Sequence, residues 1–134
     1  MAEHGTDMLL AELLRMSQKE LGCINEVYRL TAELADAFSK NDQKSARILI
    51  GMRGASLSEL ERIRGRRMKF LEASGEKRMR MERLMQGGSV PEMNEMEMRL
   101  MRLAGSFKSE LERTVELDRR VNKRIAQDKT YYQE

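Results

Sequence analysis

The sequence predicts an all-α fold, an elongated antiparallel helical hairpin or coiled-coil-like bundle of three long helices. Three observations lead to this prediction. Pro91 is the single proline in 134 residues, and proline is excluded from helix interiors because it lacks a backbone donor. Apolar residues recur every three to four positions on both sides of it, which is the period of an amphipathic helix. Charged residues make up 35% of the chain and aromatic residues 4%, a composition typical of long helices with much of their surface in water.

The composition also indicates the setting of the protein. The length fits one domain covering residues 1–134. Cys23 has no second cysteine for an intramolecular disulfide, which is usual in a reducing compartment. The N-terminal residues show no signal-peptide pattern. No apolar run approaches the ~20 residues that span a bilayer. We therefore expect a soluble, cytoplasmic protein that does not insert into membranes.

The first helix is expected at residues 6–40, with Thr6 or Asp7 as its N-terminal cap. Its apolar stripe alternates spacings of three and four, and the stripe is widened by three further residues. The stripe consists of Leu10, Leu14, Ser17, Leu21, Ile24, Tyr28, Thr31, Ala35 and Phe38, with Leu13, Val27 and Leu34 beside it. The segment Lys40-Asn41-Asp42 interrupts this pattern with two good capping residues, so the chain should turn there and begin a second helix.

The second helix is expected at residues 42–86, antiparallel to the first because the turn is short. Its expected apolar positions are Ala46, Leu49, Ile50, Leu57, Leu60, Ile63, Met68, Phe70 and Leu71. Gly51 and Gly54 fall inside this helix, where glycine costs about 1 kcal/mol relative to alanine. They mark either the close approach of a neighbouring helix or local looseness. Ser74-Gly75 is expected to kink or fray the helix.

The third helix is expected at residues 90–130, followed by a frayed tail at residues 131–134. Gly87-Gly88 should end the second helix, and Ser89-Val90-Pro91-Glu92 matches a capping box that would begin the third. In that arrangement Ser89 and Glu92 would accept hydrogen bonds from each other's backbone amides. The apolar stripe of this helix consists of Met93, Met96, Leu100, Ala104, Phe107, Leu111, Thr114, Leu117, Val121 and Ile125.

The sequence offers little for catalysis. His4 is the only histidine and lies near the N-terminus, so a histidine-based catalytic or metal site would depend on that residue alone. Cys23 lies beside Ile24 on the apolar side of the first helix, where a buried small side chain is favoured over an activated nucleophile. No glycine-rich phosphate loop and no Glu-x-x-His motif is present. We expect no enzymatic activity, no cofactor and no metal.

Two clusters could carry a binding function. Nine basic residues lie between Arg62 and Arg83, but they are not concentrated on one side of a helix, and the only aromatic residue near them is Phe70. This pattern favours a solvated surface, or one that faces an acidic partner, over a nucleic-acid site. Eight of the twelve methionines lie between Met68 and Met101. Some pairs are two residues apart and cannot both face one core, so part of this cluster should be exposed or bind a partner or a second copy of the chain. The alternative is that these methionines fill gaps at a loosely packed end of the hairpin.

The middle of the chain resembles the flagellar export chaperones of the FlgN type. The resemblance covers about residues 8–72. It consists of Leu34-Ala-Asp-Ala-Phe-Ser-Lys-Asn-Asp, the leucine-periodic segment from Leu49 to Leu60, and Leu60-Glu61-Arg62 followed by Arg66-Arg67. The family has long N-terminal helices and a short Asn-Asp-like turn. The pair Gly51 and Gly54 and the methionine density depart from that pattern.

The resemblance implies a cytoplasmic type III export chaperone. Such proteins bind hook-associated filament-junction proteins, protect their aggregation-prone terminal helices and deliver them to a component of the export apparatus. Client contacts in the family lie toward the C-terminal part, which here implies a surface made by Met93, Met96, Leu100, Met101, Phe107 and Leu111. Two alternatives stay open: a structural coiled-coil adaptor that forms homo-oligomers through the same surface, and a basic helical nucleic-acid binder.

Overall fold

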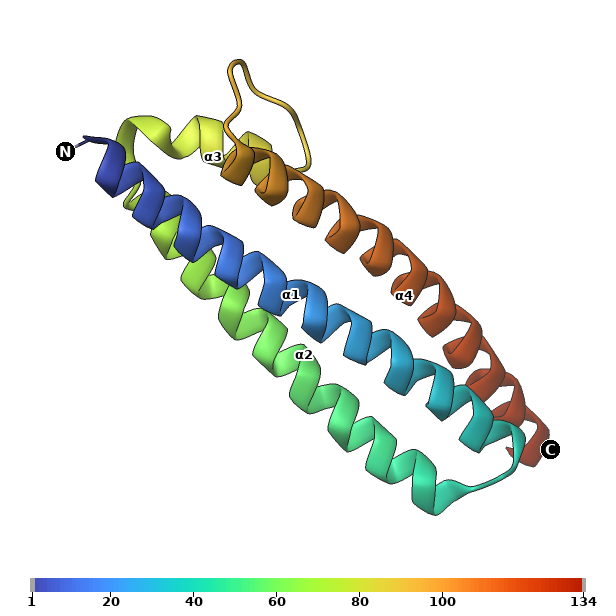
Figure 1. Cartoon of the computed structure of the whole chain (residues 1–134). Coiled ribbons are helices and arrows are strands. Elements are labelled where there is room, and N and C mark those ends of the chain that lie inside the picture. Colours follow the sequence, from blue (N-terminus) through green and yellow to red (C-terminus); the bar gives the residue numbers. More distant parts are fainter. Residues whose placement is uncertain (1, 134) are drawn as a thin grey trace.

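The computed structural model describes the backbone of residues 2–133 and the side chains of residues 8–124. Its elements are α1 (Ala2–Ser39), α2 (Gln43–Glu72), a 3₁₀ turn (Gly75–Lys77), α3 (Arg78–Met85) and α4 (Glu95–Gln133). Within residues 2–133 there is no strand, so the predicted all-α class is confirmed. Three of the four α-helices are long, and α3 is a short helix near the end of the bundle where the N-terminus lies (Figure 1).

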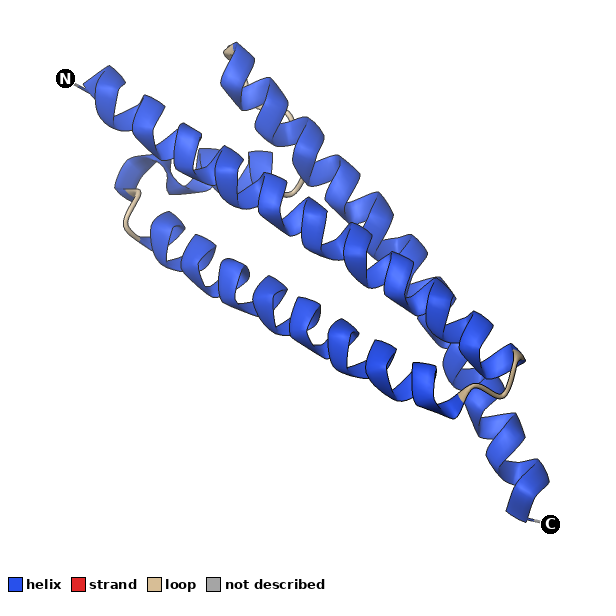
Figure 2. Cartoon of the chain, turned by 60° about the horizontal axis from the view of Figure 1, so that its bottom comes forward, coloured by secondary structure: helices blue, strands red, loops and turns tan. Residues whose placement is uncertain are grey.

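The central helix of the bundle is α1. It packs along its length against α2 on one side and against α4 on the other, and both views show α1 between them (Figures 1 and 2). The chain reverses after α1, so α2 runs antiparallel to it, whereas α4 runs parallel to it (Figure 1). This arrangement explains why α1 is the helix with the most complete burial, since its apolar stripe serves two neighbours.

The stripe predicted for α1 is mostly confirmed. Leu10, Leu14, Ile24 and Thr31 are among its buried members. The Thr31 hydroxyl donates to the Val27 carbonyl at 2.7 Å, which satisfies a buried polar group within its own helix. Helix α1 begins at Ala2, earlier than the predicted Thr6 or Asp7. The side chain of His4, and that of Ile125 in α4, lie outside the described residues.

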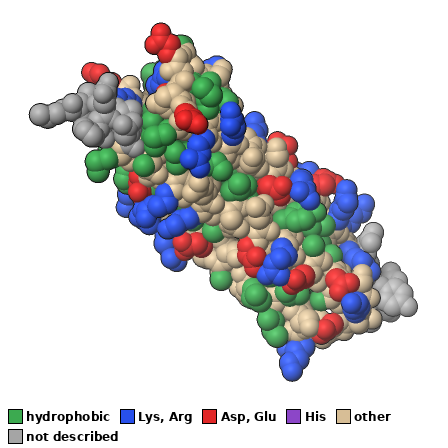
Figure 3. Space-filling view, in the orientation of Figure 1, with side chains coloured by type: hydrophobic (Ala, Val, Ile, Leu, Met, Phe, Trp, Pro, Cys, Tyr) green, Lys and Arg blue, Asp and Glu red, His purple; other side chains and the backbone are tan. Residues whose placement is uncertain are grey.

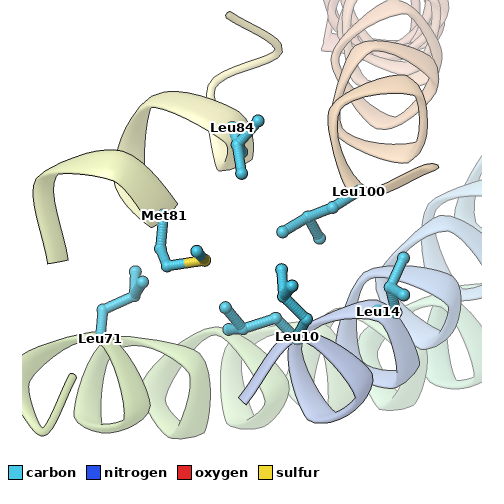
Figure 4. Packing of buried hydrophobic residues seen from close by; sticks show 7 residues of the cluster. Leu10, Leu14, Leu71, Met81, Leu84 and Leu100 are labelled. Atoms are coloured by element: carbon cyan, nitrogen blue, oxygen red, sulfur yellow. The ribbon is translucent and has the colours of Figure 1, made fainter. Parts of the chain in front are cut away.

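The apolar core is densest at the end of the bundle where α3 lies. Side chains from all four helices converge there, as Figure 4 shows for six of them. This α3-end cluster consists of Leu10, Leu13, Leu14, Leu71, Met81, Leu84 and Leu100. A smaller turn-end cluster lies beside the α1–α2 turn and consists of Leu34, Ala37, Ala46 and Val121. The two clusters fix both ends of the hairpin to α4.

The α1–α2 turn follows the prediction closely. Asn41 adopts a left-handed backbone with φ of 55°, which asparagine tolerates better than most residues. Asp42 is the N-cap of α2, and its Oδ1 accepts a hydrogen bond from the Ser45 amide at 3.0 Å. The second helix therefore begins at Gln43, one residue after the predicted start.

The helix predicted at residues 42–86 is divided into α2 and α3, at the place where Ser74-Gly75 was expected to kink or fray it. Helix α2 ends at Glu72, and Gly75 takes a φ of +60°, a conformation that favours glycine. The chain bends there, and α3 brings Met81 and Leu84 into the α3-end cluster. The predicted apolar stripe of α2 also fails in part, because only three of its residues are buried: Ala46, Ile63 and Leu71. Four members of the predicted stripe are exposed: Ile50, Leu57, Met68 and Phe70.

The predicted capping box at Ser89 and Glu92 is also wrong. Helix α4 begins at Glu95. The capping box that forms there consists of Asn94 and Glu97, each five residues after the predicted Ser89 and Glu92. The Glu97 amide donates to Asn94 Oδ1 at 2.8 Å, and the Asn94 amide donates to Glu97 Oε1 at 3.1 Å. Glu92 instead has φ of 53° in the preceding loop. At its other end α4 continues to Gln133, through most of the predicted tail.

Candidate protein-binding surface

Most of the predicted client surface on α4 packs against the rest of the bundle. Leu100 is fully buried in the α3-end cluster, so it belongs to the core and is not part of an accessible surface in this structure. Met93, Met96 and Met101 are partly buried against the same cluster. Phe107 is half-buried and lines a narrow internal gap. Of the six predicted residues, Leu111 alone is classed as exposed, at 38%.

The expectation about methionines two residues apart is confirmed at one pair. Met81 is 1% exposed, whereas Met79 is 82% exposed. Met96 and Met98 are both partly buried. The methionine-rich segment is therefore divided between core and surface, and its buried members fill the space between α3, α4 and the start of α1.

Exposed apolar side chains gather where α2 faces α4. Ile50 and Leu57 are seven residues apart on α2 and therefore share a face, and they are 48% and 43% exposed. Leu111 and Val115 are four residues apart on α4, and Val115 is 42% exposed. We call these four residues the α2–α4 seam. Ile50, Leu57 and Leu111 belong to the apolar stripes that the sequence predicts for the core, because helical spacing alone cannot show which side of a helix lacks a close neighbour.

A single ion pair shows that the two halves of the seam face each other. Arg53 lies between Ile50 and Leu57 on the same face of α2, and its Nη1 donates to Asp118 Oδ1 at 2.6 Å. Asp118 lies three residues after Val115 on α4. The seam is thus bridged by charge while its apolar side chains remain partly in water. An incompletely covered apolar strip of this kind is a common feature of protein-binding sites.

Three arginines of the basic cluster between Arg62 and Arg83 make contacts that hold the fold together. Arg80 donates to both carboxylate oxygens of Glu97, at 2.6 and 3.1 Å, and to the Pro91 carbonyl at 2.8 Å. Arg83 donates to the Ser89 carbonyl at 2.8 Å. These contacts hold the loop between α3 and α4 against the bundle. The Glu97 pKa is held below its ordinary value, chiefly by the hydrogen bond from Arg80.

Arg67 from the same cluster points into the bundle. Its Nη1 donates to both carboxylate oxygens of Glu20, at 2.7 and 2.6 Å, and the Glu20 side chain is only 3% exposed. Burial raises the pKa of Glu20, and the Arg67 guanidinium offsets this only in part. Phe107 lies beside this pair. The pair joins α1 to α2 beside Phe107, one of the residues of the client surface that the resemblance implied.

Cys23 lines a shallow groove of about 470 Å³ between α1 and α2, together with Gly22, Ala55 and Ser56. Burial raises the pKa of its thiol, and the nearby Glu59 and Glu20 carboxylates add to this effect. A raised pKa disfavours the reactive thiolate. Among the described side chains there is no group of three His, Cys, Asp or Glu residues that could hold a metal ion.

The strongest candidate for a binding surface is therefore the α2–α4 seam, where apolar side chains are partly exposed. No protein-family model, characterised protein or solved structure matches this chain. Over the described residues, none of the helices combines the length and the apolar character needed to cross a bilayer. Hydrophobic side chains reach the surface at several points along the bundle, interspersed with charges of both signs (Figure 3).

Proposed function

We propose that this protein is a cytoplasmic export chaperone that binds an amphipathic helix of a client protein along the α2–α4 seam. The observation that carries the proposal is the row of partly exposed apolar side chains on facing sides of α2 and α4. A helix laid into such a strip would cover them as a neighbouring helix covers the stripe of α1. The resemblance of residues 8–72 to FlgN-type chaperones supports hook-associated filament-junction proteins as the clients.

The seam replaces most of the surface that the sequence implied. Leu111 belongs to the seam and to the surface that the sequence implied, whereas Leu100 is buried in the core. Helix binding also fits the absence of any strongly activated side chain at the seam, because masking a client's apolar surface needs no covalent chemistry.

The proposal is tested with a double substitution on the α4 side of the seam, Leu111→Gln with Val115→Gln. Each candidate hook-associated protein is co-expressed with the chain, and the affinity of the purified pair is measured by calorimetry. We expect the double variant to bind at least tenfold more weakly, because two apolar contacts are replaced by polar side chains.

The matched control is Met79→Gln, since Met79 is an exposed apolar residue on α3, away from the seam. It should leave the affinity unchanged. Equal affinities for wild type and the seam variant would contradict the proposed surface. A homo-oligomer that dissociates in the seam variant, with no binding of any candidate, would favour the structural adaptor instead.

A further inference from the structure

A second surface lies on the outward face of α2, which points away from α1. Gly51, Gly54, Ser58 and Gly65 follow one another at helical spacings along this face, and all four are exposed. A Cβ atom added at any of these three glycines would meet nothing within 4 Å. The packing of this chain therefore does not require glycine there, although glycine is unfavourable inside a helix. The result is a flat strip on which another backbone could approach closely.

Apolar side chains border this strip on both sides. Ile48 and Met52 are four residues apart on one side, and they are 57% and 46% exposed. Ile50 and Leu57 border the other side, where the strip meets the seam. Small residues flanked by larger apolar ones give a shallow channel that suits the side-chain stripe of an amphipathic helix.

The charges on the same face are mainly positive. Lys44, Arg47 and Lys69 continue the spacing of the strip at its two ends, and none of the three forms an ion pair with a described residue. Arg62 also lies on the strip and pairs with Glu59 at 2.8 Å. Glu61 and Glu72 are the acidic residues that share this spacing. By contrast, Arg53, Arg67 and Arg80 on the other faces of α2 and α3 are held by carboxylates from α1 or α4.

We propose that the outward face of α2 docks an acidic amphipathic helix of another protein. The glycine strip sets how closely that helix can approach, the bordering Ile and Met side chains contact its apolar stripe, and the end cations pair with its carboxylates. This goes beyond the function proposed above, because it assigns a second surface that does not involve α4. Ile50 and Leu57 border both surfaces, so a partner on α2 would lie beside a client at the seam.

The chemistry favours this occupant over two others. A second copy of the chain would bring a like-charged face against this one, which is unfavourable. A nucleic acid would use the cations, but it would leave the bordering Ile48 and Met52 without an apolar partner, and no aromatic residue lies on the strip for bases to stack on.

The test uses two synthetic helical peptides as long as α2 with the same leucine and alanine stripe. One carries glutamates beside the stripe and the other carries lysines, and a DNA oligonucleotide serves as a third probe. Binding to the full chain is followed by fluorescence anisotropy. We expect the glutamate peptide to bind at least tenfold more tightly than the lysine peptide, and more weakly as salt is raised.

The decisive variant is Gly51→Gln with Gly54→Gln, which fills the strip without creating a clash in the chain itself. It should keep the helical circular dichroism of the wild type and have a urea midpoint at least as high, because glutamine favours a helix more than glycine does. It should nevertheless bind the glutamate peptide at least tenfold more weakly. Gly105→Gln is the matched control, because Gly105 is a helical glycine on α4 whose added Cβ would also meet nothing. It should bind as the wild type does.

Three results would overturn the proposal: no binding of the glutamate peptide, equal binding of both peptides, or full binding by the strip variant. Binding of the oligonucleotide that is lost on Arg47→Gln with Lys69→Gln would identify a nucleic-acid surface instead. The seam variant Leu111→Gln with Val115→Gln leaves α2 unchanged. It should therefore bind the glutamate peptide normally, which separates this proposal from the function proposed for the seam.

Discussion

At the scale of single residues, one arginine, Arg80, decides where α4 begins. Two capping patterns occur in succession, Ser89 with Glu92 and Asn94 with Glu97, and the sequence alone does not rank them. Arg80 holds the carbonyl of Pro91 as well as the Glu97 carboxylate, so the first pattern is kept in the loop and the second begins the helix. These contacts join residues eleven or more apart in the sequence. A prediction from the local sequence pattern could not include them, and it therefore placed the capping box at Ser89 and Glu92.

Replacing the cap of α4 tests this assignment directly. Asn94→Ala should lower the free energy of unfolding by about 1 kcal/mol, because the Glu97 amide loses its acceptor. Ser89→Ala should change it by no more than about 0.5 kcal/mol, as for a surface position without special contacts. Reversible urea unfolding of both variants provides the measurement. A larger loss for Ser89→Ala than for Asn94→Ala would restore the rejected box.

The Arg80–Glu97 pair should also make stability depend on pH. The pKa of Glu97 is lowered in the folded protein, so its stabilising contribution is present above the ordinary value of 4.5 and is lost as the pH falls through the lowered value. Glu97→Gln keeps an acceptor for the Asn94 amide but removes the charge. The gap in unfolding free energy between wild type and this variant should therefore shrink from pH 7 towards about pH 3.

Urea unfolding across that pH range gives the measurement. Glu20 has the opposite shift, a raised pKa, but it is present in both proteins and its effect cancels in the comparison. A gap that stays constant with pH would mean that the charge of Glu97 contributes nothing to stability.

At the scale of elements, helical periodicity predicted where helices exist, and it predicted well the face that α1 buries. It failed on α2 because that helix has a neighbour on one side only, so residues such as Ile50 and Leu57 match the period and still remain exposed. The break after Glu72 was foreseen only as a kink. Its cause is the packing of α3 on the α3-end cluster, a contact between segments far apart in the sequence. The α2–α4 seam could not be predicted either, because it depends on how α2 and α4 are placed relative to each other, and these helices are far apart in the sequence.

Two glycines of α2 and the glycine that begins the following 3₁₀ turn should respond in opposite directions to alanine. Gly51→Ala and Gly54→Ala should each raise the free energy of unfolding by about 1 kcal/mol, because the added methyl group meets nothing and alanine favours the helix. Gly75→Ala should lower it by about 1–2 kcal/mol, because its φ of +60° is unfavourable for a residue with a Cβ. Thermal and urea unfolding would show the signs. A loss of stability at Gly51 or Gly54 would mean that these positions are packed.

At the scale of the whole molecule, the two core clusters are unequal. The α3-end cluster has seven buried apolar residues, six leucines and one methionine, all with large side chains. The turn-end cluster has four, of which two are alanines. Burial of apolar surface stabilises in proportion to its area, so the end of the bundle near the α1–α2 turn is held less strongly. Ile50, at one edge of the seam, lies only one helical turn from Ala46 in that weaker cluster.

This inequality predicts that the bundle opens first at the α1–α2 turn. Native-state hydrogen exchange should show amides near Ala37 and Ala46 exchanging through a smaller opening than amides near Leu13 and Leu100, which should require nearly global unfolding. Leu34→Ala should speed exchange mainly at the turn end. Leu84→Ala should lower the whole stability by about 2–5 kcal/mol, because it leaves a cavity where all helices meet. Exchange at one common rate at both ends would contradict this order. Opening at the turn would also separate Ile50 from α4, and it would therefore widen the seam at which we propose that a client helix binds.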